Sequence, residues 1–195
     1  MRMKSLLAAS ILLAAAACQD GGEGGNNGAD GNAAAGGNAQ QAQAGRSIGD
    51  AAAQSADLAQ FSQAVQAAGL ADTLRSSGPY TVFAPVNAAF EAVPAETRTR
   101  LMAAEGRERL TELLTFHIVP GVITAEDLDA AIRRGQGRAT VTTVSGANLT
   151  VSREGNALVV ADPSGSRARV VQADRIQSNG VIHHVDALLM PGGRR

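Results

Sequence analysis

Two adjacent histidines near the C-terminus, His183 and His184, are the residues whose type and spacing most invite a metal ion. On a strand, His184 and Asp186 share one face, while His183 points to the other. A zinc site needs at least three protein ligands, so a third would have to come from elsewhere, such as the distant His117. We therefore predict structural roles for the histidines and no metal site.

The sequence offers no motif for nucleotide-phosphate chemistry, since it contains no Gly-x-x-x-x-Gly-Lys-Ser/Thr phosphate loop. Two acids that converge in space could still act as a glycosidase pair, and the sequence leaves that reading open. Glu126, Asp127 and Asp129 are better explained by a helix start and a solvated face. We expect a protein that is not an enzyme and needs no cofactor.

Arginine supplies nearly all the positive charge, since Lys4 is the only lysine. Arg167 and Arg169 share one face of a predicted strand, and forked guanidinium groups suit anionic glycans or lipopolysaccharide phosphates. The alternative is a solvated sheet surface with neighbouring acids. The full candidate patch is Arg133, Arg134, Arg138, Arg167, Arg169 and Arg175.

The overall composition excludes a general nucleic-acid binder. The 195 residues carry 17 basic and 18 acidic side chains, so the basic surplus typical of such proteins is missing. One Tyr, four Phe and no Trp are too few for a base-stacking platform. The single cysteine can form neither an internal disulfide nor a thiolate metal cage.

That cysteine, Cys18, ends an export-type leader. Arg2 and Lys4 precede an apolar run too short to span a bilayer, an order typical of a secretory signal peptide, here residues 1–17. The small residues before Cys18 resemble the lipobox of bacterial lipoproteins, although Ala15 stands where Leu is usual. The resemblance implies an acylated Cys18 inserted in the lipid bilayer. The alternative is an ordinary signal peptide.

Composition divides the remaining chain. Residues 18–46 hold the candidate lipidated cysteine and a stretch rich in Gly, Asn, Ala and Gln, which cannot bury enough apolar surface to fold and should be a flexible tether. Residues 47–191 contain nearly all the large apolar side chains and should form one domain. Residues 192–195 should be a frayed end.

The apolar period within this domain changes from helical to extended. Leu58, Phe61 and Val65 form a helical stripe, and Thr124 is a predicted helix cap. Further helices are expected over 88–93, 96–102, 105–116 and 124–134. Strands are expected over 80–84, 149–152, 158–161, 168–172 and 181–185. Helices followed by strands predict an α+β fold with an antiparallel sheet or sandwich.

Three segments of the domain then match one family. They are Thr81–Phe90 (TVFAPVNAAF), Leu113–Gly121 (LLTFHIVPG) and Asn179–Pro191 (NGVIHHVDALLMP). In this order and spacing they resemble the fasciclin domain, often called FAS1, over essentially all of 47–191. The resemblance implies a compact α+β wedge, with helices packed around a small antiparallel β-sandwich. It also implies a non-enzymatic role in adhesion and in cell-surface or matrix contacts.

Residues of these motifs also have a direct physical interpretation. Pro85 should end a strand because it lacks an N–H for the ladder, and Asn87 should then cap the next helix. His117 is expected to be buried and hydrogen-bonded to the backbone. The predicted structural residues are Pro85, Asn87, His117, Asn179, Gly180 and His183.

Two segments resemble stretches that are linked to integrin binding in some animal members of the family. In the first, Phe116 replaces the usual Tyr beside His117. In the second, Gln172–Gln177, Asp174 keeps an acid but Arg175 intrudes, so we do not carry an integrin role over. The candidate binding residues are Phe116, His117, Asp174, Arg175, Arg167 and Arg169.

The combined expectation is an exported, membrane-anchored domain on a tether that contacts a cell-surface or matrix protein or a polysaccharide, as in adhesion or biofilm association. Gln19 stands where Asp is associated with inner-membrane retention in enteric bacteria, so the outer membrane is the expected location, on its periplasmic side or its surface. The alternative is a periplasmic structural or envelope-stress protein that binds a small molecule or an envelope polymer.

Overall fold

The computed structural model describes residues 45–76 and 78–191. The predicted signal peptide, Cys18, the tether up to residue 44 and the expected frayed end at 192–195 lie outside the described residues. Among the residues that are described, no helix combines the length and the apolar character needed to cross a bilayer.

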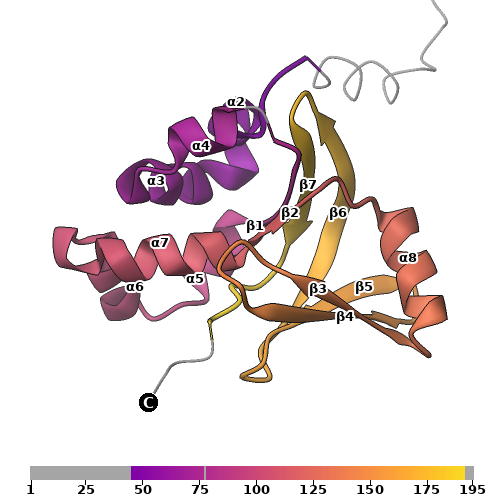
Figure 1. The fold of residues 1–195 in the computed structure, drawn as a ribbon. Coiled ribbons are helices and arrows are strands. Elements are labelled where there is room, and N and C mark those ends of the chain that lie inside the picture. The colour runs from indigo at the N-terminus through magenta and orange to yellow at the C-terminus, as the bar shows by residue number, and fades with distance from the viewer. Residues whose placement is uncertain (1–44, 77, 192–195) are drawn as a thin grey trace, which may run out of the picture. The chain divides into compact units, whose positions relative to one another are not determined.

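Helices occupy the first half of the described chain and strands most of the second (Figure 1). The helices are α2 (Ile48–Gln54), η1 (Ala56–Leu58), α3 (Ala59–Ala68), α4 (Ala71–Arg75), α5 (Asn87–Glu91), α6 (Ala95–Met102), η2 (Ala104–Gly106), α7 (Arg107–Phe116) and α8 (Ala125–Arg134). The strands are β1 (Tyr80–Pro85), β2 (Ile118–Pro120), β3 (Arg138–Thr142), β4 (Asn148–Glu154), β5 (Ala157–Ala161), β6 (Arg167–Gln177) and β7 (Gly180–Val185). The predicted α+β class is confirmed.

The seven strands form one sheet in the order β2-β1-β7-β6-β5-β4-β3. Neighbouring strands are antiparallel except for β1 and β7, which run parallel from Tyr80 beside Gly180 to Pro85 beside Val185. The sheet therefore differs from the predicted antiparallel one in this pair. An alternating pattern predicts a strand and its buried face, but it does not identify the partner strand.

Strand β6 bends the sheet toward a barrel. Its first residues, Arg167–Arg169, pair with β5, and Val170–Gln177 pair with β7, with two register shifts along the way. Such bulges bend a strand and increase its twist. The two ends of the sheet then meet, because the Val144 N–H, just after β3, donates to the Ile118 carbonyl of β2 at 2.7 Å.

Strand β1 packs on both of its faces. Val82 and Ala84 contact the cluster formed with the helices from α2 to α7, whereas Phe83 points into a second cluster inside the curled sheet. Leu128 and Ile132 of α8 cover this second cluster. Figure 1 shows the consequence: α8 lies apart from the other helices, across the sheet.

Cap and turn chemistry placed several boundaries correctly. The Thr124 Oγ1 accepts the Asp127 N–H at 3.2 Å, and the Asp127 carboxylate accepts the Thr124 N–H at 3.0 Å, which completes a capping box on α8. β1 ends at Pro85. The short elements α2, α4, β2 and β3 were not predicted.

The predicted N-cap role of Asn87 is wrong. α5 begins at Asn87 itself, Val86 occupies the N-cap position, and no side chain caps this helix. The Asn87 Oδ1 instead accepts the Gln60 N–H at 3.0 Å, and its Nδ2 donates to the Ala56 carbonyl at 2.7 Å. Asn87 therefore caps α3 from a different part of the chain.

Candidate functional site

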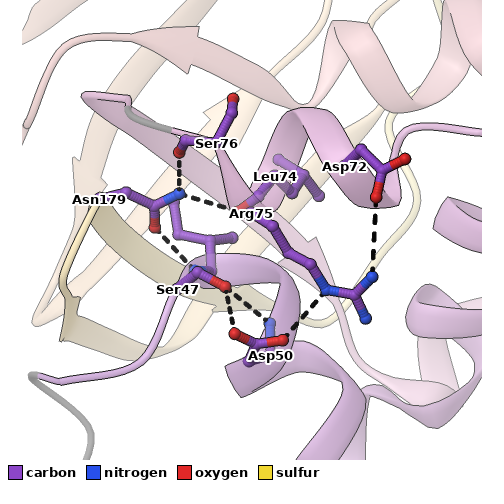
Figure 2. A network of polar contacts seen from close by, with 8 residues as sticks. Ser47, Asp50, Asp72, Leu74, Arg75, Ser76 and Asn179 are labelled. Atoms are coloured by element: carbon purple, nitrogen blue, oxygen red, sulfur yellow. Dashed lines mark hydrogen bonds and ion pairs between the residues drawn. The ribbon is translucent and has the colours of Figure 1, made fainter.

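Asn179, in the turn between β6 and β7, holds the start of the domain in place (Figure 2). Its Oδ1 accepts the Ile48 N–H at 2.8 Å, and its Nδ2 donates to the carbonyls of Leu74 at 2.8 Å and Ser76 at 2.7 Å. One amide thus satisfies backbone groups at the first turn of α2 and at the end of α4, which otherwise have no partner within their helices.

Charged side chains surround this turn. Arg75 donates through Nε to the Asp50 carboxylate at 3.1 Å and lies 3.9 Å from Asp72, as Figure 2 shows. The Ser47 hydroxyl donates to the same Asp50 carboxylate at 2.7 Å. Hydrogen bonds from Ser47 and from Arg75 lower the pKa of Asp50. Asp50 and Asp72 thus share the one guanidinium group of Arg75.

The next residue, Gly180, must be a glycine because β1 and β7 approach each other closely at this position. It pairs with Tyr80 at the start of the parallel β1–β7 ladder. A Cβ atom at this position would overlap the Tyr80 carbonyl oxygen, which is backbone and cannot move aside. Only glycine fits here.

His183 lies at the centre of a second network. Its Nδ1 accepts the Asp174 N–H at 3.2 Å, so its Nε2 carries the proton and donates to the Ile123 carbonyl at 2.9 Å. The Asp174 carboxylate accepts the N–H of Ala125, the first residue of α8, at 2.7 Å. The ring stacks on Phe83, and burial lowers the pKa of His183. The network positions α8 and uses both ring nitrogens.

His117 forms a third, fully buried contact. Its Nε2 accepts the Leu189 N–H at 3.2 Å, and its Nδ1 donates to the Leu113 carbonyl at 2.8 Å. Burial lowers the pKa of His117 to about 4, so the ring is neutral at physiological pH. Phe116 and His117 are both 0 % exposed. The prediction that they contact a macromolecular ligand is therefore wrong, because no surface atom of either is available.

The residues that invited a metal ion serve separate purposes. His183 is saturated by backbone groups, as described above. The Asp186 carboxylate accepts the Arg169 N–H at 2.7 Å, and burial lowers the pKa of His184. Within residues 45–76 and 78–191, no group of three or more His, Cys, Asp or Glu side chains could hold a metal ion.

An open cavity of about 460 Å³ lies beside the Asn179 turn. Val122 and Ile176 line it and are 53 % and 55 % exposed, which is unusual for large aliphatic side chains in this domain. Gln177 also lines it, yet is only 5 % exposed, and its Oε1 has no hydrogen-bond partner among the described residues. We refer to this feature as the Ile176 cavity.

A second open surface is the outward side of β3–β6. The register places Arg138, Ser152, Val159 and Arg169 in one row across the four strands. A neighbouring row contains Thr140, Thr150, Ala161 and Arg167. The residues between them, such as Ala139 and Ala168, point to the inner cluster. We call these two rows the arginine face.

The charge of the arginine face is positive but partly neutralised. Arg167 forms an ion pair with Glu154 across β5, and the outward Val159 between them is buried. In the described part of the chain, neither Arg138 nor Arg169 takes part in an ion pair. Two exposed arginines, Arg138 on β3 and Arg169 on β6, therefore remain without an ion pair on either side of the Arg167–Glu154 pair among the described residues.

The predicted six-arginine patch does not form as a unit. Arg133 and Arg134 end α8, which packs through Leu128 and Ile132 on the inner side of the strands. Arg175 follows the β6 bulges and donates to the Gln172 side chain at 3.1 Å. The structure brings together only Arg138, Arg167 and Arg169.

Sequence reasoning missed the cavity and the true partners of Asn179 and Asn87. The cavity residues come from three segments far apart in the chain, so no local pattern could reveal it. An amide that bonds a distant backbone group has the same local sequence as one that caps its own helix. Ile176 carried a usable signal, since it is an isolated aliphatic residue, whereas Val122 did not, because Ile123 follows it directly.

Comparison with known proteins identifies the relatives of this fold. The Fasciclin domain profile matches residues 56–191. Protein sll1483 of Synechocystis is 40 % identical over 128 residues, which are 66 % of this chain and 64 % of that protein. The immunogenic protein MPB70 of Mycobacterium bovis is 37 % identical over 122 residues, 63 % of this chain and 54 % of that protein. The chain thus spans less than two thirds of both relatives.

A solved structure has the same architecture. It contains a FAS1 domain pair from the insect cell adhesion molecule fasciclin I, and it superposes with a TM-score of 0.66 at 16 % sequence identity. The match covers 73 % of this chain and 50 % of the solved one. At this identity the similarity concerns the fold, a sheet with a parallel β1–β7 pair and helices packed on it.

Proposed function

This chain belongs to the fasciclin domain family, and from that premise we propose that it acts outside the cytoplasm as a non-enzymatic contact domain, held to the cell envelope by an acylated Cys18. The solved relative comes from a cell adhesion molecule, which supports a contact role. A secretory leader that ends in a lone cysteine supports export and anchoring.

The described geometry favours binding over catalysis. His117 and His183 have both ring nitrogens bonded to the backbone, so neither is placed to activate a nucleophile. Burial lowers the pKa of each, which keeps the rings neutral and structural. The motif residues stabilise the fold, so we expect ligand binding on the exposed surfaces.

The arginine face is the observation that carries the proposal. The backbones of Arg138 and Arg169 are separated by three strand spacings, about 14 Å, with Ser152 and Val159 between them in the row and the Arg167–Glu154 ion pair across β5. This spacing separates the backbones that carry the two cations. A chain with regularly repeated carboxylate or sulfate groups can reach both guanidinium groups, so the ligand class that fits is an anionic polysaccharide.

A tethered anchor suits such a weak contact. Each exposed guanidinium–anion contact contributes about 0.2–1 kcal/mol, so one face binds weakly. Many anchored copies on one membrane engage the same polymer, and the effective concentration then raises the overall affinity. Adhesion to a matrix polysaccharide, as in a biofilm, would follow from this arrangement.

Binding of the full chain to alginate, a polyuronate, tests the proposal at low ionic strength, with neutral dextran as the control polymer. We expect R138S/R169S to weaken alginate binding about fivefold, because both exposed cations of the face are lost. R167S/R169S should weaken it less, because Arg167 is already paired with Glu154.

R133S/R134S is the matched control, since it removes the same charge from the end of α8 on the other side of the strands. Alginate binding should persist in this variant. Equal weakening in both double variants would show a response to net charge alone and would contradict a defined face. Unchanged binding in R138S/R169S would remove the arginine face as the site.

A further inference from the structure

An ion pair crosses the middle of the arginine face. Glu154 of β4 lies beside Ala157 of β5, in the outward row on one side of Val159. Arg167 of β6 lies beside Ala161 of β5, in the outward row on the other side of Val159. The Arg167 guanidinium group donates to the Glu154 carboxylate, so the two side chains meet above β5 and pass over Val159. We call this ion pair the strap.

The burial of Val159 agrees with this path of the strap. Val159 points outward and belongs to neither of the two apolar clusters, yet it is only 1 % exposed. The outward residues before and after it on β5, Ala157 and Ala161, are too small to cover it. The side chains of Ser152 and Arg169 lie beside it, and the strap lies above it. The strap therefore covers an apolar strip along β5.

The strap can be exchanged for a contact with a ligand. The side chains of Arg167 and Glu154 expose 56 % and 40 % of their surface. An exposed ion pair contributes little to stability, because water screens it and both long side chains lose freedom. A carboxylate of a ligand offers the guanidinium group the same charge-assisted hydrogen bonds as Glu154 does. The exchange therefore requires little free energy, and it uncovers Val159.

Three cations lie on this side of the strands. Arg138 and Arg169 lie on either side of the strap, and neither takes part in an ion pair within the described residues. Arg167 becomes the third available cation once the strap opens. Arg153 does not contribute, because it points to the opposite side of β4 and pairs there with Asp129 of α8 at 3.2 Å.

Three carboxylates lie on or next to the same strands. Asp186 follows β7 and accepts the Arg169 backbone N–H at 2.7 Å. Asp162 follows β5, is 7 % exposed, and accepts the backbone N–H groups of its own turn. Of these three, Glu154 alone pairs with a cation of the arginine face. Glu154 is therefore the carboxylate that an anionic ligand can displace.

We propose that a uronate unit of an anionic polysaccharide replaces Glu154 on Arg167, and that the apolar C–H face of its sugar ring packs on the uncovered Val159. This inference rests on the proposed function, since it concerns the same face, and it narrows the ligand class to carboxylated sugars. Glu154 is then a specificity-determining residue, because it keeps Arg167 paired until a carboxylate displaces it. A polyanion without an apolar ring face, such as polyphosphate, forms no contact with Val159.

Alginate binding of the full chain at low ionic strength tests the role of Glu154. E154Q should strengthen alginate binding about threefold, because the ligand no longer competes with a carboxylate of the protein. E96Q is the matched control, since it also breaks an exposed Glu–Arg ion pair, that with Arg100 on α6, and changes the net charge equally. It should leave alginate binding unchanged. Equal strengthening in E154Q and E96Q would overturn the proposal.

A double-mutant cycle separates exchange from simple attraction. In the unchanged protein, R167S should weaken alginate binding less than about twofold, because the lost contact is offset by a strap that no longer has to open. In E154Q, R167S should weaken it about fourfold, since Arg167 then binds the ligand without competition. Equal effects of R167S in the two backgrounds would show attraction by charge alone and would contradict the exchange.

The contact with the sugar ring has its own test. Val159→Thr keeps the branched shape of the side chain and adds a hydroxyl group to the apolar strip. It should weaken alginate binding about threefold and leave polyphosphate binding unchanged, because only the sugar ring loses an apolar contact. In the unchanged protein, the Val159 methyl groups should show intermolecular NOEs to the ring protons of alginate oligosaccharides. Their absence at saturation would overturn the ring contact without the need for a variant.

Failure of this inference and failure of the proposed function give different results. If the unchanged protein and R138S/R169S bind alginate equally, or neither binds it, the arginine face is not a polysaccharide site, and the role of Glu154 is overturned with it. If R138S/R169S weakens binding as expected while E154Q binds like E96Q, the face is the site, but the strap does not control it.

Discussion

Individual side chains of the family motifs have structural roles, because they connect distant segments of the chain. Asn179, His117 and His183 each bond backbone groups that lie far away in the sequence. Their residue types were recognisable in the sequence, and burial of His117 followed from its apolar neighbours. Their distant partners were not recognisable, because a hydrogen bond between remote segments leaves no spacing pattern.

Folding stability should fall with acid in the range where histidines titrate. Burial holds the pKa of His117 near 4, below that of an unfolded histidine near 6.5. As the pH falls through 6.5, the unfolded chain binds the proton first, so stability present above pH 6.5 is lost progressively toward pH 4. The loss from this residue alone should be about 2 kcal/mol at pH 5. The lowered pKa values of His183 and His184 act in the same direction.

Urea unfolding at pH 7, 6 and 5 measures this dependence. Aspartates with lowered pKa values, such as Asp162, lose their contribution only at lower pH, so this window reports on the histidines. A constant free energy of unfolding between pH 7 and pH 5 would contradict neutral, buried rings. The His117 ring resonance should not titrate above pH 5.

Asn179→Ala should destabilise the domain by about 2–3 kcal/mol, since three hydrogen bonds to backbone groups are lost. Asn156→Ala, in the exposed β4–β5 turn, is the matched control and should change stability by less than about 0.5 kcal/mol. Chemical denaturation of both variants decides the question. Equal losses of stability in the two variants would mean that the hydrogen bonds of Asn179 in Figure 2 do not stabilise the domain.

At the scale of elements, helix caps could be predicted where the capping side chain bonds its own helix, and the prediction failed where the side chain bonds a distant helix. Thr124 and Asp127 form their capping box within four residues. Asn87 looked like the same kind of signal, yet its side chain reaches α3. Short strands such as β2 were missed because three residues show no period. The parallel β1–β7 pair lay beyond any local pattern.

Asn87→Ala should therefore destabilise the N-terminus of α3 rather than that of α5. We expect a loss of about 1 kcal/mol, typical of a removed cap. Amide exchange should accelerate at Gln60, whose N–H loses its acceptor. Exchange monitored residue by residue makes α5 the internal control. Faster exchange confined to the first turn of α5 would restore the original N-cap interpretation.

For the molecule as a whole, the sequence predicted the α+β class and the family, because three motifs in order cover the domain. It did not predict the surfaces. The arginine face needed the register of four strands, and the Ile176 cavity needed three distant segments. A surface combines residues from distant segments and has no local sequence pattern, whereas the structural residues of the fold lie in short motifs that can be recognised in the sequence.

Anchoring is a property of the whole chain and depends on Cys18. Cys18→Ser should move the protein from the detergent phase to the aqueous phase in a phase-partition experiment, because the acyl chains that hold it in the bilayer cannot be attached. The unchanged chain should stay with the detergent. Aqueous partition of both proteins would show that residues 1–17 act as an ordinary signal peptide.

Protease treatment of intact cells, with an epitope tag after Arg195 and a periplasmic protein as leakage control, tests the proposed contact role most directly. A domain that contacts surfaces or matrix outside the cell must be digested in unbroken cells while the control stays intact, and this is the result we predict. Protection until the outer envelope is broken would contradict adhesion. It would instead place the domain in the periplasm, where an envelope polymer becomes the ligand to test.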